Sequence, residues 1–590
     1  MQKLSILTLI FGLFLFSAFI PSGDDDWRSK IDDPILEYFE SSDEPIDFLV
    51  VLEKQADLSY AQQLRSKSEK GEWVFKQLQQ TAQESQVDLL RWLNQEHLDF
   101  QSFYLINAIR VVGDWDVVRS IAQRTEIAGL HVNPSIRMEK PQRWSTEDLK
   151  VLEWGISRIN ADDVWQLGFR GQGAVVGGQD TGYQWDHPAL INTYRGWDGS
   201  TANHDYNWHD AIHEINPLHN DPTDDPSNNP CGLDAVAPCD DNGHGTHTMG
   251  TMVGEDNDSQ IGVAPDADWI CCRNMERGWG QPSTYIECFE WFLAPTDVAG
   301  NNPDPLKAPD VIANSWSCPE VEGCFPSNFA DMELAVNNLT AAGVFVVVSA
   351  GNSGGNGCST ISTPAAIFEN SFTVGALRSD DTLAAFSSRG LVTIDGSNRL
   401  KPNVSAPGRF VRSSYLNDGY ATLSGTSMAG PHVAGVVALM ISADTSLAGD
   451  ISRIKQILES TTYPAYSVDT CGNIVPTVLP NPNVGYGGVD ALAAVQEVLN
   501  STSIISLLAD AIRVFPNPNA GVFNLEVKGI SGEGILEVFD LQGRQVLSLQ
   551  RNWTNGEQQV IHVTEVPNGV YVYRFSHEKG STQGKLMVSQ

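Results

Sequence analysis

The chain has 590 residues, with 73 acidic against 37 basic side chains and a formal net charge of −36. A chain of this length is expected to form several domains and a large core. The strong negative charge argues against nucleic acid and anionic membrane surfaces as partners, because both carry charge of the same sign. We interpret the charge as serving solubility.

At the N-terminus, Lys3 precedes an almost uncharged apolar run over 4–20, which ends at the Pro-Ser-Gly of 21–23. A basic start followed by an apolar run is typical of a secretory signal peptide, so we assign residues 1–23 to one. A retained membrane anchor is the alternative, because the run approaches the length that spans a bilayer. No later segment looks apolar enough to span a membrane.

A cysteine-free unit follows, which we bound at 24–145. Its apolar pattern predicts the order β-α-β-β-α-β, which is typical of a ferredoxin-like α+β unit. We expect a strand at 48–52, a helical stretch after Gly71, a strand over 103–112, a helix over 115–123 and a strand over 130–136. Taken alone, the unit would be only a small α+β domain.

The middle of the chain alternates apolar strands with helical stretches. This pattern predicts a mainly parallel α/β sheet with helices on both faces. The first of these strands, within GQGAVVGGQDTG over 171–182, ends in a turn at Asp180. An acid at the carboxyl end of such a strand lies where α/β sheets bind ligands. An aspartate in an ordinary turn is the alternative, and it would be preferred for this stretch alone.

Two histidines, His244 and His247, lie three residues apart in DNGHGTHTMGT over 241–251. A metal-binding pair is one interpretation, but HExxH is absent and no third ligand is near in sequence. The loop over 203–242 is rich in Asp, Asn, His and Pro, and such oxygen ligands suit Ca²⁺. A solvated acidic loop is equally consistent, because no EF-hand spacing appears.

A buried parallel strand is expected where the apolar run over 344–349 precedes Ala-Gly-Asn, ending at Asn352. Further along, Ser427 lies among small residues in LSGTSMAGPHVAG over 423–435, and an apolar helix follows. We expect Ser427 at the N-terminus of this helix and Pro431 in its first turn. The positive end of the helix and its free N–H groups would then favour an oxyanion. Simple capping of a buried helix is the alternative.

The stretches around Asp180, His244 and Ser427 resemble the three motifs of the subtilisin-like (S8) serine peptidases, in that family's chain order. The resemblance implies that Ser427 is the nucleophile, His244 the general base and Asp180 the residue that orients the imidazole. It places Asn352 in the oxyanion hole and gives His247 a structural role. It also implies that no cofactor is required for the chemistry, with structural calcium a possibility.

Substrate contacts are expected from VIANSWS over 311–317, which resembles the family's strand that pairs with an extended peptide. Trp316 with Cys318, the CCRNM of 271–275 and the WFLAPT of 291–296 resemble the bacillopeptidase F-like branch. The residues expected to bind substrate are Ser315, Trp316, Ser317 and Gly351.

Because it lies between an export signal and a peptidase domain over 146–502, the unit over 24–145 resembles the inhibitory propeptide of these enzymes. The resemblance implies that its last strand occupies the substrate cleft until the chain is cut. We expect the cut between about Met138 and Trp154, a polar segment suited to be an exposed linker. The propeptide would thus be an intramolecular inhibitor, and the enzyme would mature itself.

Nine cysteines all lie between Cys231 and Cys471. An exported chain permits disulfides, and short loops could close between Cys231 and Cys239 and between Cys318 and Cys324. The odd number leaves at least one cysteine unpaired or bonded outside the chain. Zinc is a weaker alternative, because no CxxC pair is present.

After about residue 503, short alternating segments separated by turns predict a small all-β sandwich over 503–590. The turn cluster VFPNPNAG, an Asp-x-x-Gly turn from Asp540, a Gly-Val-Tyr strand and Lys585 resemble the type A C-terminal sorting domain of type IX secretion. The resemblance implies passage across an outer membrane, then release or surface attachment. A carbohydrate- or protein-binding module is the alternative. Strands are expected at 523–527, 535–539, 545–549, 559–563 and 570–575.

Together these resemblances predict a secreted, monomeric serine endopeptidase that acts on proteins or peptides. Its C-terminal domain would engage the secretion machinery. Two rival functions stay open. One is a catalytically inactive binding protein that keeps the subtilisin fold, and the other is an esterase that uses the same acyl chemistry.

Overall fold

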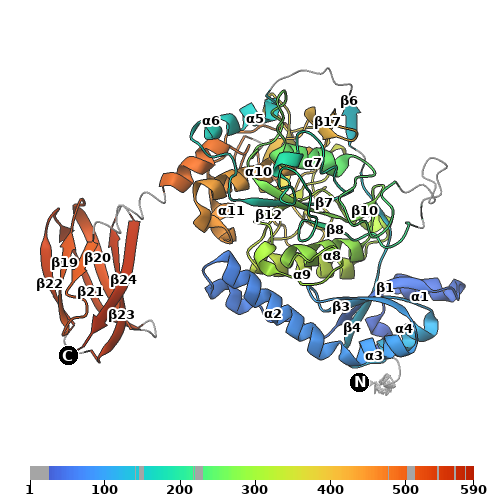
Figure 1. Ribbon diagram of the computed structural model, residues 1–590, viewed down its shortest axis with the longest axis horizontal. Coiled ribbons are helices and arrows are strands. Elements are labelled where there is room, and N and C mark those ends of the chain that lie inside the picture. Colours follow the sequence, from blue (N-terminus) through green and yellow to red (C-terminus); the bar gives the residue numbers. More distant parts are fainter. Residues whose placement is uncertain are drawn as a thin grey trace, which may run out of the picture.

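The computed structural model describes residues 26–139, 141–144, 152–216, 218, 230–475, 477–500, 512–540, 544–563, 566–577 and 580–589. The expected signal peptide lies outside these residues, as do 140 and 145–151 of the expected cleavage linker. Figure 1 shows three folded units in chain order: an N-terminal unit in blue, a large central domain and a C-terminal β unit in red.

The N-terminal unit is an antiparallel sheet in the order β2-β3-β1-β4. After the helix α1, which was not predicted, it has the predicted order of strands and helices, with two helices in the first helical stretch. Two expectations are wrong. The range 103–112 is not one strand, because 104–107 turn between β2 and β3, which pair as a hairpin. The range 130–136 is not one strand either, because β4 ends at Val132 and the next strand begins at Ile136. Its elements are α1 (Asp33–Ser41), β1 (Ile46–Leu52), α2 (Lys67–Ser85), α3 (Val87–Gln95), β2 (Asp99–Phe103), β3 (Ala108–Gly113), α4 (Trp115–Ala122) and β4 (Ile127–Val132).

The central domain is built on a seven-stranded parallel sheet in the order β15-β14-β13-β12-β7-β9-β8. Alternate residues of β13 belong to two different cores, with Phe345 and Val347 in one and Val346 and Val348 in the other. The sheet therefore buries both faces, as predicted. Its strands are β7 (Val175–Asp180), β8 (Trp208–Asp210), β9 (Asp268–Arg273), β12 (Val311–Asn314), β13 (Phe345–Ser349), β14 (Phe372–Leu377) and β15 (Val404–Pro407).

Helices cover both faces of this sheet. On one face lie α7 (His244–Val253), α10 (Thr426–Ala443) and α11 (Ile451–Ser460), and on the other α8 (Pro282–Leu293) and α9 (Pro326–Ala341). Figure 1 shows the N-terminal sheet beside α8 and α9. Shorter elements of the central part are α5 (Trp154–Arg158), α6 (Ala161–Gln166), β10 (Met275–Glu276), β11 (Trp279–Gly280), β16 (Val411–Tyr415) and β17 (Gly419–Ser424).

The apolar helix α10 corrects one expectation. It is long and apolar enough to cross a membrane by length and composition, although no later segment was expected to qualify. Its residues from Thr426 to Ile441 are buried against the sheet and α7, so it is the core helix of the domain.

The C-terminal unit is the predicted sandwich, with antiparallel sheets β18-β19-β22 and β21-β20-β23-β24 around a core that includes Phe523, Leu536 and Phe575. Two strands were not predicted: β18, whose end was assigned to a turn cluster, and β24, which is polar in sequence and is defined by pairing with β23. The strands are β18 (Ile512–Phe515), β19 (Val522–Val527), β20 (Gly532–Phe539), β21 (Gln545–Trp553), β22 (Gln558–His562), β23 (Gly569–His577) and β24 (Gly580–Val588).

Eight of the nine cysteines form disulfides. Both short loops proposed from the sequence are closed, and the unpaired cysteine is the buried Cys271. The pairs are Cys231–Cys239, Cys272–Cys288, Cys318–Cys324 and Cys358–Cys471.

Candidate active site

Asp180 and His244 meet at the carboxyl end of β7, although they lie 64 residues apart in sequence. β7 ends at Asp180 and α7 begins at His244, so both side chains are carried by rigid elements. The His244 Nδ1 lies 2.7 and 2.8 Å from the two carboxylate oxygens of Asp180, and both residues are buried. The second ring nitrogen, Nε2, is buried and has no hydrogen-bond partner among the described residues.

The electrostatics of this pair favour a charged imidazole. Burial lowers the pKa of His244, but the charge and hydrogen bond of Asp180 outweigh it, so the pKa lies above its ordinary value. His247 has the opposite environment: burial lowers its pKa to about 3, and its Nε2 donates to the carbonyl oxygens of Val411 and Ala421. His247 is therefore neutral, and its hydrogen bonds to two carbonyl groups join α7 to the β16–β17 hairpin. This is a structural role.

Ser427 is the second residue of α10, directly after the strand β17 and Gly425. It lies at the N-terminus of the helix, as expected. Pro431 does not lie in the first turn, as predicted, because the helix starts at Thr426 and makes Pro431 its sixth residue. There it removes the N–H that would bond the Ser427 carbonyl.

Asn352 follows β13 and is fixed by the residue before Ser427. Its side-chain oxygen accepts hydrogen bonds from the backbone N–H and the hydroxyl of Thr426, at 2.9 and 3.1 Å. This orientation leaves the amide NH₂ as the group that can donate to a ligand.

A narrow cavity brings together Ser427, Asn352 and all four residues expected to bind substrate. Its lining is Met138, Glu139, Ser315, Trp316, Ser317, Ser349, Gly351, Asn352, Thr363, Thr426 and Ser427. A neighbouring cavity is lined by Met138, Pro141, Arg143, Asn242, His244, Tyr415 and Leu423. Because Met138 lines both cavities, Ser427 and His244 face the same segment of chain.

That segment is paired with the central domain on both sides of the site. Before it, β5 (Ile136–Arg137) pairs antiparallel with β11, and the N–H of Met138 donates to the Gly278 carbonyl at 2.8 Å. After it, β6 (Gln142–Trp144) pairs antiparallel with β17. Neither β11 nor β17 is predicted from the sequence to pair with this segment. β11 is only two residues long, and the role of β17 is visible only through its pairing with β6.

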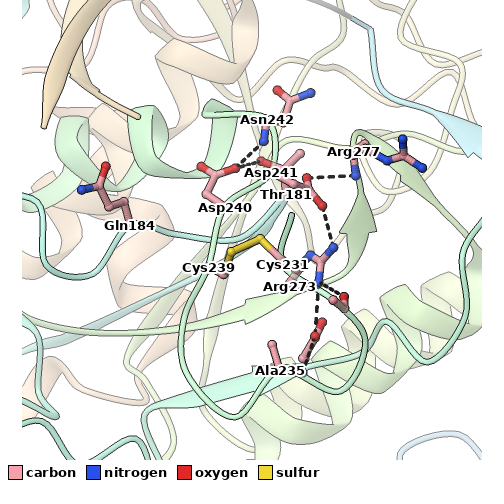
Figure 2. The surroundings of a disulfide bond; sticks show 12 residues. Thr181, Gln184, Cys231, Ala235, Cys239, Asp240, Asp241, Asn242, Arg273 and Arg277 are labelled. Atoms are coloured by element: carbon pink, nitrogen blue, oxygen red, sulfur yellow. Dashed lines mark hydrogen bonds and ion pairs between the residues drawn. A yellow bond between two sulfur atoms is a disulfide. The ribbon is translucent and has the colours of Figure 1, made fainter. Parts of the chain in front are cut away.

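Asp240 connects the two elements that carry Asp180 and His244 (Figure 2). Its carboxylate accepts from the Thr181 hydroxyl, next to Asp180, at 2.9 Å. It also accepts from the N–H groups of Gly243 and Thr246, on either side of His244, at 2.7 and 3.0 Å. A single carboxylate therefore fixes the end of β7 against the start of α7.

The neighbouring Asp241 is held by Arg273, which is fully buried at the end of β9 (Figure 2). Arg273 lies 2.5 Å from Asp241 and 3.2 Å from Asp210, so one cation joins two acidic residues. The Cys231–Cys239 disulfide closes the loop that leads into Asp240. Sequence reasoning missed this arrangement, because a charged residue in a buried strand shows its partners only after folding.

Replacing Arg273 by methionine should destabilise the central domain by about 3–5 kcal/mol, because it leaves two buried carboxylates without their cation. The measurement is denaturant unfolding of the precursor in a Ser427→Ala background, which prevents self-digestion. Arg453→Met is the matched control: its ion pair with Glu497 is partly exposed and should be worth at most about 1 kcal/mol. Equal unfolding midpoints for the two variants would contradict the assignment.

In the described part of the acidic loop over 203–242, no set of side chains is arranged as calcium ligands. Two of its acids, Asp210 and Asp241, are paired with Arg273. Among the described residues, no group of three or more His, Cys, Asp or Glu side chains is arranged to hold a metal ion. Residues 217 and 219–229 of the loop lie outside that set, so calcium stays a prediction.

Comparison with known proteins identifies the family. Residues 171–492, more than half of the chain, match the Subtilase family of S8 peptidases. The chain belongs to the subtilase family. Members of this family need no cofactor for their chemistry. Residues 513–589 match a secretion system C-terminal sorting domain, which indicates secretion and attachment to the cell surface.

Individual relatives agree with this assignment. Bacillopeptidase F of Bacillus subtilis (strain 168) is 35% identical over 457 residues, which are 72% of this chain and 29% of that protein. M-protease of Shouchella clausii (strain KSM-K16) is 31% identical over 317 residues, 53% of this chain and 66% of that protein. Subtilisin BL of Lederbergia lenta is 33% identical over 289 residues, 49% of this chain and 83% of that protein. The chain thus spans under a third of Bacillopeptidase F and just under two thirds of M-protease.

Proposed function

We propose that this chain is the precursor of a secreted serine endopeptidase with Asp180, His244 and Ser427 as its catalytic triad. The observation that carries the proposal is the buried His244. Its Nδ1 is bound to Asp180, and its Nε2 has no partner among the described residues; His244 and Ser427 line neighbouring cavities that share Met138. Such a histidine is oriented by an acid on one side and is available as a base on the other.

In this mechanism the Ser427 hydroxyl attacks the carbonyl carbon of the scissile bond while His244 Nε2 takes its proton. The amide nitrogen of Asn352 and the N–H groups at the start of α10 would stabilise the oxyanion. His244 then gives the proton to the leaving amine, and an acyl-enzyme stays on Ser427. Water, deprotonated by His244, hydrolyses the ester. Asp180 keeps the imidazole in one tautomer and stabilises its charged form.

Peptides are better substrates for this site than simple esters. Strands β11 and β17 provide backbone hydrogen bonds on either side of the nucleophile, and an extended peptide is the ligand that uses both. A small ester would leave these strand edges unused. We also propose four substrate-binding residues, because they line the cavity that contains Ser427: Ser315, Trp316, Ser317 and Gly351.

The unit over 24–145 is proposed to inhibit the enzyme until it is removed. Glu290 on α8 accepts from the N–H groups of Tyr104 and Leu105 in the turn between β2 and β3, at 2.5 and 2.7 Å. The Nδ1 of His131 on β4 lies 2.7 Å from Asp331 on α9. These contacts support a propeptide that docks on α8 and α9 while its following strand fills the cleft.

The bond proposed for maturation is the one after Glu139. The N–H of Met138 is bound to Gly278, Glu139 lines the cavity with Ser427, and Pro141 lines the cavity with His244. We therefore assign the scissile carbonyl to Glu139, within the predicted region. Cutting there makes Lys140 the first residue of the mature enzyme. The mature enzyme is proposed to act as a monomer, and the sorting domain to engage the secretion machinery.

Asn352→Ala should lower kcat about 10²- to 10³-fold and leave KM little changed, because the lost donor acts on the transition state. Steady-state kinetics on a peptide substrate measure the effect. Asn356→Ala, a change on the loop that follows Asn352, is the control and should have kinetics like the unaltered enzyme. A kcat within a factor of two of the unaltered enzyme would remove Asn352 from the oxyanion hole.

The proposed function is tested by treating the matured protein with a serine-directed fluorophosphonate. The labelled residue is mapped by mass spectrometry while casein hydrolysis is followed. Label on Ser427 with parallel loss of hydrolysis supports the peptidase, and comparison of ester with casein hydrolysis separates it from an esterase. No label after verified removal of the propeptide would favour the inactive binding protein.

A further inference from the structure

The leaving-group side of the cleft contains a peptide-binding surface beyond the triad. We name it the β17 surface, and it consists of the strand Gly419–Ser424 with the rings of Tyr415 and Phe410. In its sheet the order is β16-β17-β6, so within the described part of the chain β6 is the strand that covers this edge of β17. The pairs are Gln142 with Ser424, Arg143 with Leu423 and Trp144 with Thr422.

Trp144 makes two side-chain contacts with this surface. Its ring centroid lies 4.8 Å from that of Phe410 in an edge-to-face arrangement, a favoured geometry for aromatic pairs. Its indole N–H donates to the Ser424 hydroxyl at 3.2 Å. The same hydroxyl accepts from the Phe410 N–H at 2.9 Å, which holds Phe410 beside the strand. The indole is therefore recognised by both its ring and its polar atom.

Arg143 contacts the other ring. Its guanidinium carbon lies 4.5 Å from the centroid of Tyr415, within the range of a cation–π interaction. The hydroxyl of Tyr415 donates to the Asn242 carbonyl at 2.9 Å, which fixes the ring close to His244. A basic side chain at this position thus lies over a ring that is already anchored.

We propose that the β17 surface binds the leaving-group side of peptide substrates and selects a basic residue followed by an aromatic one. This inference rests on the proposed function and adds a substrate class to it. With the scissile bond after Glu139, Arg143 and Trp144 are the fourth and fifth residues on the leaving-group side. The same strand edge and rings are available to a substrate peptide once β6 leaves.

The test compares hydrolysis of synthetic peptides by the matured protein. The parent peptide is Ile-Arg-Met-Glu-Lys-Pro-Gln-Arg-Trp, the sequence of residues 136–144. In two variants the last arginine becomes glutamate or the tryptophan becomes alanine, and in a control the glutamine, whose side chain makes no contact used here, becomes alanine. Each contact is exposed, so kcat/KM should fall about two- to fivefold for each of the two variants. The control should match the parent.

A change in the enzyme then assigns the effect to this surface. Phe410→Ala should remove the preference for tryptophan and keep the preference for arginine. Tyr466→Ala, which removes another exposed ring, should keep both. The peptide series is repeated with a protein that carries Arg143→Glu and Trp144→Ala. Its own β6 should bind β17 more weakly and so compete less with the peptides. The ratio of kcat/KM between parent and variant peptides should be at least as large in this protein.

Equal kcat/KM for all peptides in both proteins would overturn the β17 surface as a specificity site, while leaving the peptidase intact. Failure to cleave any peptide or casein would instead mean that the proposed function is wrong. If Phe410→Ala does not fold, the peptide series with unaltered Phe410 still decides between these outcomes.

Discussion

The Ser427→Ala precursor is expected to lose hydrolysis and to keep its propeptide. Removing the nucleophile of such a triad costs on the order of 10⁶ in kcat, and the residual rate is too slow to mature the chain. The unaltered precursor should convert to a shorter chain whose first residue is Lys140, as read by N-terminal sequencing. The mutant should stay at the precursor size over the same period, as followed by gel electrophoresis.

Ser446→Ala is the control for this experiment, because Ser446 is exposed and outside the cleft. It should mature at the rate of the unaltered chain. Self-maturation is wrong if purified Ser427→Ala still loses its propeptide in the absence of other proteases. A first residue other than Lys140 would keep self-maturation and correct only the assigned bond.

Features of the fold that a local pattern determines could be predicted from the sequence. The apolar run before Asp180 predicts a strand that ends at the acid, and the small residues around Ser427 predict a helix that begins there. The order of elements in the N-terminal unit also followed from periodicity. Each of these features depends on residues near one another in the chain, so they could be predicted without knowledge of tertiary contacts.

Other parts of the site depend on contacts between distant segments. Asp240 resembles any loop aspartate until it receives hydrogen bonds from both Thr181 and Thr246. Arg273 lies in an apolar strand, and its acidic partners come from two other segments. The β17 edge is proposed as a peptide-binding strand because β6 pairs with it. Such partners are set by packing, and one sequence does not specify them.

Asp180→Asn should lower kcat by about 10⁴ while leaving the fold intact, and it should change the pH dependence in a defined direction. Asp180 accepts from His244 Nδ1, and an asparagine that donates there would select the tautomer in which Nε2 carries the proton. That tautomer is unable to take the proton of Ser427. The measurement is kcat/KM on a peptide substrate from acidic to alkaline pH, with Asp186→Asn, an exposed neighbour, as the control.

The direction of the pH shift follows from the charge of Asp180. His244 must be neutral to act as a base, so activity is lost as pH falls through its pKa. In the unaltered protein Asp180 holds this pKa above its ordinary value, which places the acid limb at higher pH than for a free histidine. Without that charge, burial is the largest influence left, opposed only by the charge of Asp240, so the pKa falls and the acid limb of the residual activity should move to lower pH. If the acid limb of the pH profile does not move, or if kcat stays near that of the unaltered enzyme, Asp180 does not orient and charge-stabilise the catalytic histidine.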